Sequence, residues 1–235
     1  MIELPRVEFE QTPESLGFWP YAGEWIAQEK IDGERAILEW GNLRGRKLNH
    51  NLPGDLPEAF RSAVLDGELV GGVFHVFDVV CWGGQEMSRQ PLESRLALLD
   101  SIAPQFPAWM KPVESSVDLA GFYAEVVARG GEGVVAKKLS AGWGKQWVKV
   151  KHTLTHDLVV ESLDASKRSA ACYQIRNGER LDVGRVFLGR AFESVRVGDV
   201  IEVVAMSRHA SGKLREARFV RSRPDKPAAA CVVTA

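Results

Sequence analysis

Short runs of β-branched and apolar residues dominate the first 151 positions and predict mostly strands. Two strand-like runs flank a turn at Asp32–Gly33, and a longer apolar run is suited to a buried strand. Those runs cover residues 24–31, 35–40 and 71–82. Apolar residues at helical spacing predict helices over residues 56–65, 91–103 and 118–131. Strands and helices are interspersed without the glycine fingerprint of a βαβ unit, so the pattern predicts an α+β fold.

After Lys151 the pattern changes to short, closely spaced strands. Turn signals such as Asn177–Gly178 and Ser211–Gly212 separate five runs. These expected strands cover residues 157–164, 170–176, 186–192, 198–207 and 214–223. Five short strands in so short a segment predict a small Greek-key barrel of the oligonucleotide-binding (OB) kind. We therefore expect two domains, residues 1–151 and residues 152–235.

The boundary between these domains is expected at HTLTH, residues 152–156. His152 and His156 stand four apart and could bind a metal. No third ligand is nearby, so a linker explains this stretch better.

Composition narrows the class of protein. In 235 residues, 45% are hydrophobic and 26% are charged, which excludes a disordered chain. No apolar run is long enough to span a membrane, and the start, MIELPRVEFEQTPES, lacks the apolar region of a secretory leader. Three scattered cysteines form neither a disulfide framework nor a zinc site. These features predict a cytoplasmic protein without a signal peptide or a membrane partner.

The charge is divided unevenly between the two expected domains. Residues 1–151 hold 16 Lys and Arg against 21 Asp and Glu, whereas residues 152–235 hold 14 against 10. A basic second domain is suited to a polyanionic partner, although a solvated basic surface explains the same excess.

Several short stretches combine charged residues in ways that suggest chemistry. Lys30 lies between Glu29 and Asp32 in QEKIDGER. Asp66 and Glu68 stand two apart in DGELV, so on a strand they point to one face, as Lys149 and Lys151 do in WVKVK. Two cations on one strand face repel each other unless an anion such as phosphate lies between them. Taken singly, the stretches are more typical of ordinary structure: an exposed strand face for the lysines, a hairpin turn for the glycines and a cross-strand ion pair for the acids.

Taken in order, five stretches resemble the collinear motifs of the covalent nucleotidyltransferases. This family comprises ATP-dependent DNA ligases, RNA ligases and mRNA capping enzymes. The stretches are KIDGER, LDGELV, VFDVV, GGEGVVAKK and WVKVK, and they span Lys30 to Lys151. Their number, order and spacing make coincidence an inadequate explanation.

The resemblance implies a role for each matched residue. Lys30 would be the nucleophile that attacks the α-phosphorus of ATP, and Asp32 would assist the reaction. Phe77 would stack on the purine, although periodicity alone would place it in the core. Glu68 would bind the ribose, and Glu132 together with Glu68 would place a Mg²⁺ or Mn²⁺ ion. The remaining residues expected to bind the nucleotide in this domain are Glu29, Arg35, Lys149 and Lys151.

The second domain favours the DNA ligase branch. Residues 215–227, REARFVRSRPDKP, resemble the last ligase motif, in which Arg221 and Lys226 would orient pyrophosphate, with Arg218 and Arg223 as alternates. RNA ligases generally lack this barrel, capping enzymes use GTP, and NAD-dependent ligases carry a further domain ahead of the lysine, where only 29 residues stand here. DNA contacts are expected from Arg44, Arg46, Lys167, Arg168 and Arg218.

The sequence thus predicts a minimal, monomeric ATP-dependent DNA ligase that seals nicks in duplex DNA. The alternatives are an RNA ligase, a GTP-dependent capping-type enzyme, and a nucleic-acid-binding module that has kept the fold and lost catalysis. Label transferred from ATP, GTP or NAD to Lys30 would separate these alternatives.

Overall fold

The computed structural model describes residues 9–11, 23–46 and 48–233, and the chain forms two compact units. The first unit is Met1–His152 and the second is Thr153–Ala235, so the predicted boundary lies one residue before the observed division. Most of residues 1–15, where the sequence predicts no secretory leader, lie outside the described residues. Over the described ranges, no helix is long and apolar enough to cross a membrane.

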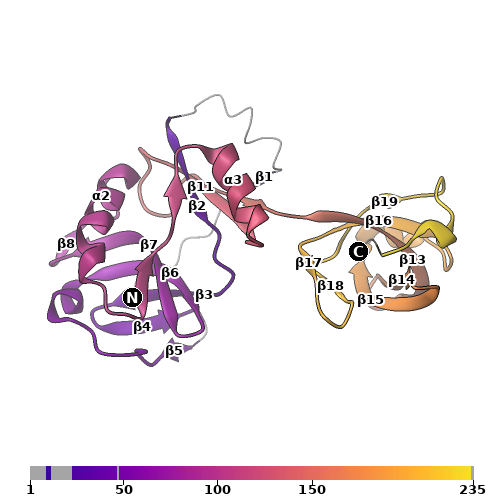
Figure 1. The fold of residues 1–235 in the computed structure, drawn as a ribbon, viewed down its shortest axis with the longest axis horizontal. Helices are drawn as coiled ribbons and strands as arrows, with labels where there is room; N and C mark the ends of the chain where they lie inside the picture. The colour runs from indigo at the N-terminus through magenta and orange to yellow at the C-terminus, as the bar shows by residue number, and fades with distance from the viewer. Residues whose placement is uncertain (1–8, 12–22, 47, 234–235) are drawn as a thin grey trace. The chain divides into compact units, whose positions relative to one another are not determined.

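Two β-sheets form the first unit (Figure 1). One has five strands in the order β1–β12–β11–β2–β10, and the other has the order β5–β4–β3–β6–β7–β8 with β9 paired to β7. All pairings are antiparallel except β1 with β12 and β7 with β9. The strands of the first sheet are β1 Phe9–Gln11, β2 Trp25–Glu29, β10 Ser115–Ser116, β11 Gly133–Lys138 and β12 Trp147–Lys151. Those of the second are β3 Glu34–Glu39, β4 Asn42–Gly45, β5 Asn49–His50, β6 Val64–Val70, β7 Val73–Trp82, β8 Gln85–Glu86 and β9 Met110–Pro112.

Within the described ranges two α-helices cover these sheets, and both were predicted. Helix α2, Leu92–Ile102, packs against β7, and helix α3, Leu119–Ala128, packs against β2 and β11. Asp118 begins α3 by accepting a hydrogen bond from the Gly121 amide.

The helix predicted over residues 56–65 is wrong. Only a 3₁₀ turn forms there, at Glu58–Ser62, and β6 begins at Val64. Phe60, Val64 and Leu65 are buried as the apolar spacing suggested. Pairing of β6 with β3 and β7 overrides that spacing, because a central strand must satisfy its backbone on both edges.

The five-stranded sheet has two chemically different faces. Ala27, Val134, Ala136, Val148 and Val150 form a core with Leu119, Phe122 and Val126 of α3. Because side chains alternate along a strand, the residues between them lie on the opposite face. That face therefore carries Gln28, Val135, Lys137, Lys149 and Lys151.

The turn at Asp32–Gly33 joins the two sheets and does not close a hairpin. Strand β2 lies in the five-stranded sheet, and β3 lies in the other. At Gly33 a Cβ atom would lie 2.4 Å from Val70 Cγ2 and 2.6 Å from the Leu69 carbonyl oxygen. Close approach to β6 therefore requires glycine, and it sets the path of the chain just after Lys30.

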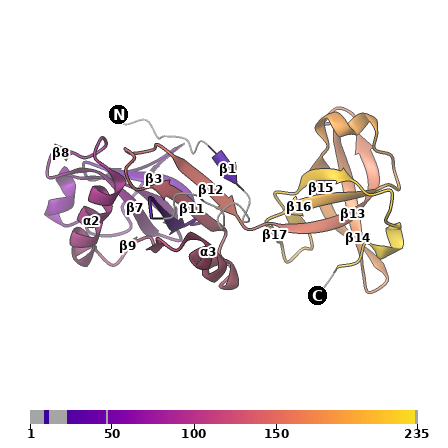
Figure 2. The same cartoon turned by 90° about the horizontal axis from the view of Figure 1, so that it is seen from above.

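The second unit is a closed barrel of five strands, with order β13–β14–β15–β19–β16 (Figure 2). Its strands are β13 Leu154–Asp164, β14 Ser169–Arg176, β15 Glu179–Phe187, β16 Val200–Ala205 and β19 Arg218–Ser222. A short pair, β17 Ser207–Arg208 and β18 Leu214–Arg215, adjoins it. The barrel core contains Leu158, Val160, Val183, Ile201 and Val203.

The third barrel strand differs from its predicted position. The prediction placed it at residues 186–192, whereas β15 covers Glu179–Phe187 and a 3₁₀ turn follows at Gly189–Glu193. Charged side chains at Arg180, Asp182 and Arg185 conceal its alternation, although the Asn177–Gly178 turn before it forms with both φ angles positive. The linker is also shorter than HTLTH, because β13 already begins at Leu154.

Candidate active site

Lys30 follows the last residue of β2, where the chain crosses between the sheets. Its amide donates to the Gly133 carbonyl oxygen at 2.9 Å. Its Nζ lies 2.7 Å from Glu132 Oε1, and Lys151 Nζ lies 3.8 Å from the same oxygen. Lys30, just after β2, and Lys151, on β12, therefore converge on one nearly buried carboxylate.

Glu132 is held by the tight turn between α3 and β11. Gly133 has a φ of +127°, and a Cβ there would lie 2.1 Å from the Val150 carbonyl oxygen. The backbone of Glu132 accepts a hydrogen bond from the His152 amide at 2.8 Å. These contacts explain the glycine that follows the acid in the sequence, and they fix the carboxylate beside Lys30.

The two carboxylates of DGELV have separate environments. Asp66 is fully buried and accepts from Arg35 Nε at 3.1 Å, from Arg35 Nη2 at 2.6 Å and from Trp143 Nε1 at 2.8 Å. Glu68 is half-buried, and burial raises its pKa to about 7 against the opposing effects of Lys30 and Arg35. Asp66 therefore orients Arg35, and Glu68 is the carboxylate that belongs with Lys30.

Phe77 lies at the contact between the two sheets. Its ring meets Trp147 edge to face, with 5.7 Å between the ring centroids. Gln28 Nε2 donates to the Phe77 carbonyl oxygen at 3.1 Å. Phe77 is only partly buried, unlike its neighbours Val76 and Asp78, so it is not the core residue that periodicity alone suggests.

Some residues predicted to belong to the site do not lie with Lys30, Glu132 and Lys151. Glu29 lies on the other side of its strand, with Oε2 2.8 Å from Arg129 Nη2, and Asp32 is exposed. Arg44 pairs with Glu39 on the neighbouring strand. Arg46 is exposed. The contacts of these four residues with nucleotide or DNA stay predictions.

The predicted residues of the second unit are held mainly by ion pairs within the barrel. Lys226 Nζ lies 2.6 Å from Asp157 Oδ2, and Arg221 Nη2 lies 2.9 Å from Glu202 Oε2. Arg223 contacts Asp157, Glu202 and Asp225, and it lowers the pKa of Asp225 to about 2. Lys167, Arg168 and Arg218 are exposed, and Arg168 pairs with Glu193.

A divalent cation is compatible with the acids of the first unit. Glu132 Oε2 is buried and has no hydrogen-bond partner among the described residues, so one oxygen of this carboxylate stands unused beside Lys30. No group of three or more His, Cys, Asp or Glu that could hold a metal occurs in the described part of the chain. Mg²⁺ usually binds through one or two carboxylates and keeps several waters, which agrees with Glu132 and Glu68 as its protein ligands.

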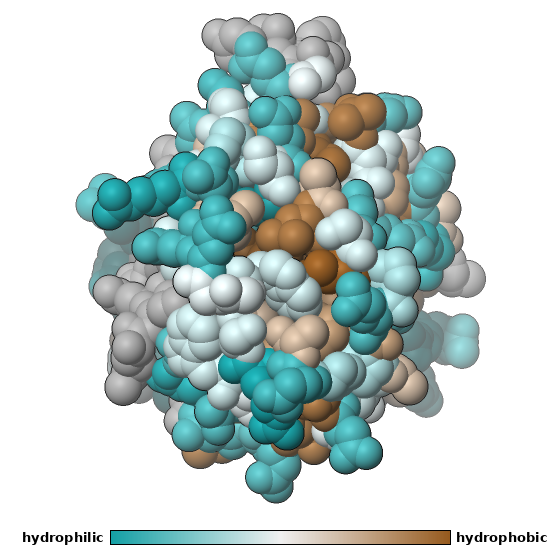
Figure 3. Space-filling model, turned by 90° about the vertical axis from the view of Figure 1, so that its left-hand side faces the viewer, coloured by the Kyte–Doolittle hydropathy of each residue, from teal (hydrophilic) through white to brown (hydrophobic). Residues whose placement is uncertain are grey.

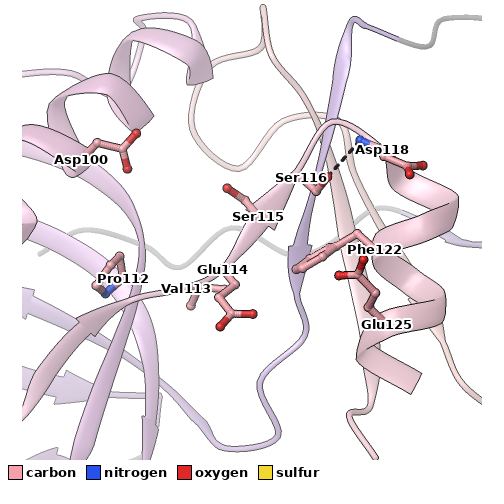
Figure 4. A pocket seen from close by; sticks show the side chains of 9 residues that line it. All are labelled: Asp100, Pro112, Val113, Glu114, Ser115, Ser116, Asp118, Phe122 and Glu125. Carbon is pink, nitrogen blue, oxygen red and sulfur yellow. Dashed lines mark hydrogen bonds between the residues drawn. The ribbon is translucent and has the colours of Figure 1, made fainter. Parts of the chain in front are cut away.

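A separate hollow of about 500 Å³ opens between the β9–β10 segment and α3 (Figure 4). Its lining includes Asp100, Glu114, Asp118 and Glu125, and no predicted site residue. Four carboxylates would repel a nucleotide or a nucleic-acid backbone. The surface drawn in Figure 3 is also mixed, with hydrophobic side chains in its middle and hydrophilic ones around them.

Lys137 is a residue that the motif comparison missed. It lies on β11 and is 2% exposed, with its Nζ 4.2 Å from the centroid of the Phe77 ring and 4.0 Å from that of Trp147. The signal was present in GGEGVVAKK, because alternation from Val135 places Lys137 on the same face as Lys149.

Comparisons with known proteins agree with this geometry. Residues 68–151 match the family model described as the ATP dependent DNA ligase domain. A probable DNA ligase of Kineococcus radiotolerans is 31% identical over 85% of this chain and 46% of its own length. DNA ligase B of Mycobacterium tuberculosis is 30% identical over 68% of this chain and 40% of its own length. The chain thus spans less than half the length of these curated relatives.

Solved structures share the fold over most of the chain. A structure of a Lig E DNA ligase aligns with a TM-score of 0.72 at 21% identity, covering 95% of this chain and all of that one. A mycobacterial DNA ligase D complexed with ATP aligns with a TM-score of 0.57 at 22% identity, covering 98% of each chain. The matched residues 68–151 include Glu68, Phe77, Glu132 and both lysines of β12. Together with the 31% identity to the Kineococcus protein over 85% of this chain, this match shows that the chain belongs to the family of ATP-dependent DNA ligases.

Proposed function

We propose that this protein is an ATP-dependent DNA ligase that seals nicks in duplex DNA through a covalent lysyl-AMP on Lys30. The observation that carries this proposal is the contact between Lys30 and Glu132, at 2.7 Å, with Lys151 at 3.8 Å from the same oxygen. A nucleophilic amine, a nearly buried acid and a second cation at one point are what transfer from a nucleoside triphosphate requires. Relatives named DNA ligases favour this activity over those of RNA ligases and capping enzymes.

The first step forms a phosphoramidate. The neutral amine of Lys30 attacks the α-phosphorus of ATP, a P–N bond forms, the bond to the bridging oxygen breaks, and pyrophosphate leaves. Lys149 and Lys151 would neutralise charge on the α-phosphate, because both lie on the face of β12 turned away from α3. Phe77 would stack on the adenine, and Glu68 would bind the ribose.

Glu132 and Glu68 would hold Mg²⁺ or Mn²⁺, which supplies further positive charge to the phosphates when it is bound. The residues of this chain prepare that site in two ways. Glu132 presents a buried oxygen without a partner among the described residues, and Glu68 is partly desolvated. Both features are costly without a cation and become favourable with one.

The later steps use the same residues. AMP passes from Lys30 to the 5′-phosphate at a nick, and attack by the 3′-hydroxyl then joins the strand and releases AMP. Asp32 and Arg35 would serve these transfers, and Arg44 and Arg46 would contact the DNA backbone.

We also propose that the two units are an adenylation domain and an OB-fold domain. The closed barrel order β13–β14–β15–β19–β16, with β15 parallel to β19, supports the assignment of the second unit. Lys167, Arg168 and Arg218 would contact DNA, and Arg221 and Lys226 would bind pyrophosphate. The protein would act as a monomer in the cytoplasm.

Covalent labelling tests the proposal directly. The protein is incubated with magnesium and labelled ATP, GTP or NAD, denatured, and examined for label that remains on the chain. Label from ATP is expected, is lost in Lys30→Ala, and is retained in the control Lys111→Ala, which changes an exposed lysine elsewhere in the same unit. Adding DNA with a single nick should then discharge the label and seal the strand. The absence of label from every donor would refute the enzyme, and label from GTP alone would assign the chain to capping.

A further inference from the structure

Two acids stand side by side on the outer face of the barrel. Asp157 on β13 pairs in register with Glu202 on β16, and Glu202 pairs with Arg221 on β19. The next residues along these strands, Leu158 and Ile201, belong to the barrel core, so the two acids point away from it. Like charges directly opposite each other on adjacent strands are unfavourable unless cations lie beside them.

Asp157 contacts two cations, one through each oxygen. Its Oδ1 lies 3.1 Å from Arg223 Nη1, and its Oδ2 lies 2.6 Å from Lys226 Nζ. Arg223 and Lys226 are the ends of a turn that contains Pro224, and the Lys226 amide donates to the Arg223 carbonyl oxygen at 3.1 Å. The turn brings the two residues together, and Asp157 sets the spacing of their charged groups.

Glu202 extends this arrangement to a third cation. Its Oε2 lies 3.1 Å from Arg223 Nη1 and 2.9 Å from Arg221 Nη2. Each acid therefore lies between two cations, with Arg223 shared by both acids. The side chains of Asp157 and Glu202 are each 14% exposed, against 28% for Lys226 and 63% for Arg221. The acids are thus more deeply covered than these two cations, which stay open to a ligand.

Some donors of these cations are still available. Lys226 Nζ makes one hydrogen bond to the described residues, and Arg221 bonds to them through Nε and Nη2 but not through Nη1. A long, flexible side chain loses conformational entropy when a ligand fixes it, and a carboxylate that already holds it reduces this cost. A polyphosphate that binds here would therefore meet cations whose positions are already set.

We propose that Asp157 is a positioning residue, which holds Arg223 and Lys226 at the spacing that receives pyrophosphate. Glu202 holds Arg221 beside them in the same way. This inference rests on the proposed function, in which Arg221 and Lys226 bind pyrophosphate. It gives a role to two acids that the proposed reaction leaves unused, and it predicts that their loss affects only the step in which pyrophosphate takes part.

The test compares a reaction that uses pyrophosphate with one that does not. In the first, pyrophosphate is added to protein that carries labelled AMP. A pyrophosphate oxygen attacks the phosphorus, the P–N bond to Lys30 breaks, the released nitrogen takes up a proton, and ATP forms. In the second, protein without AMP seals a nick whose 5′-phosphate already carries AMP. There the 3′-hydroxyl attacks the phosphorus, loses its proton and releases AMP.

Asp157→Asn keeps the shape of the side chain and removes its charge. We expect it to raise KM for pyrophosphate roughly five- to hundredfold, as when two side chains lose their fixed arrangement. Sealing of the adenylated nick should stay within about twofold of the wild-type rate. Once Lys226→Met has removed one of the two cations, Asp157→Asn should raise KM for pyrophosphate by a smaller factor than in the wild type.

Glu161→Gln is the matched control, because Glu161 lies further along the same strand and pairs with Arg180 at 3.6 Å. This variant also removes one carboxylate from the outer surface of the barrel. Both reactions should stay within about twofold of wild type in it.

Three outcomes would overturn the inference. A KM for pyrophosphate in Asp157→Asn within about twofold of the wild-type value would show that this acid does not position the cations. A lower KM would show that Asp157 covers the cations and competes with pyrophosphate. An equal loss in both reactions would show a purely structural role, because sealing of the adenylated nick involves no pyrophosphate.

Failure of the proposed function would be distinguishable. If wild-type protein took no label from ATP, the reaction would be refuted. Calorimetric titration of inorganic pyrophosphate into wild type and Asp157→Asn would then test the positioning role by itself. Equal affinity in the two proteins would refute that role, and weaker binding in Asp157→Asn would support it.

Discussion

Replacing Lys137 with methionine should stabilise the first unit, and by an amount that depends on pH. Burial lowers the pKa of Lys137 from 10.5 to about 7, an effect that Asp78 and Asp66 only partly oppose. Between these two values the unfolded chain holds a proton that the folded chain lacks. The free energy of unfolding of the wild type therefore rises with pH across this window, whereas a methionine side chain at this position contributes no such term.

The size of the effect follows from linkage. One pH unit is worth about 1.4 kcal/mol when the unfolded state binds one more proton than the folded state. Near pH 7 the folded lysine is only half titrated, so the change between pH 7 and pH 9 is about 2 kcal/mol. The advantage of Lys137→Met over wild type should shrink by this amount over that range. Below about pH 6 the advantage should be constant, because both states then carry the proton.

Urea unfolding followed by tryptophan fluorescence measures this difference in the first unit alone. All seven tryptophans precede residue 152, so the barrel contributes no tryptophan signal. Lys138→Met serves as the control, because Lys138 lies on the same strand, is partly exposed and pairs with Glu24 at 3.5 Å. Stability curves for wild type and Lys137→Met that run parallel from about pH 6 to about pH 9 would refute the reasoning.

Three substitutions test residues of the candidate site, and a change of salt concentration tests the proposed contact with DNA. Gly33→Ala would drive a Cβ into Val70 and the Leu69 carbonyl, so we expect a loss of about 2 kcal/mol in urea unfolding; an unchanged midpoint would contradict that close approach. Asp66→Asn leaves the Arg35 guanidinium without its carboxylate and should cost about 3 kcal/mol, measurable by the same method, whereas a cost below about 1 kcal/mol would mean that the pair contributes little. Glu132→Gln should slow self-adenylation at least about 100-fold, and retained labelling would remove Glu132 from the site. Binding to nicked DNA should weaken steeply between low and moderate salt in a filter or fluorescence assay, and a flat affinity would argue against phosphate contacts.

The motif residues could be located from the sequence because each obeys a local rule. Alternation places Lys149 and Lys151 on one face of β12, and it also buries Val148 and Val150 against α3. The Asn177–Gly178 turn has the conformation that this dipeptide favours. Such features depend on a few adjacent residues, so a single sequence carries them.

Other features depend on contacts that no local pattern encodes. Asp66 and Glu68 share a face in any strand. Only the hydrogen bonds from Arg35 and Trp143, which are distant in sequence, give Asp66 a structural role. The 56–65 segment has helical spacing, but pairing on both edges converts its end into β6. Lys137 looks like an ordinary strand cation until Phe77, from another sheet, is placed over it.

Phe77 and Lys30 depend on the same junction between two sheets. The chain crosses that junction after Lys30, at a glycine pressed against β6. Gln28 bridges it to the Phe77 backbone, and the Phe77 ring meets Trp147 across it. Any movement of one sheet against the other would therefore displace the Phe77 ring and the Lys30 amine together. One junction therefore sets the positions of both Phe77 and Lys30.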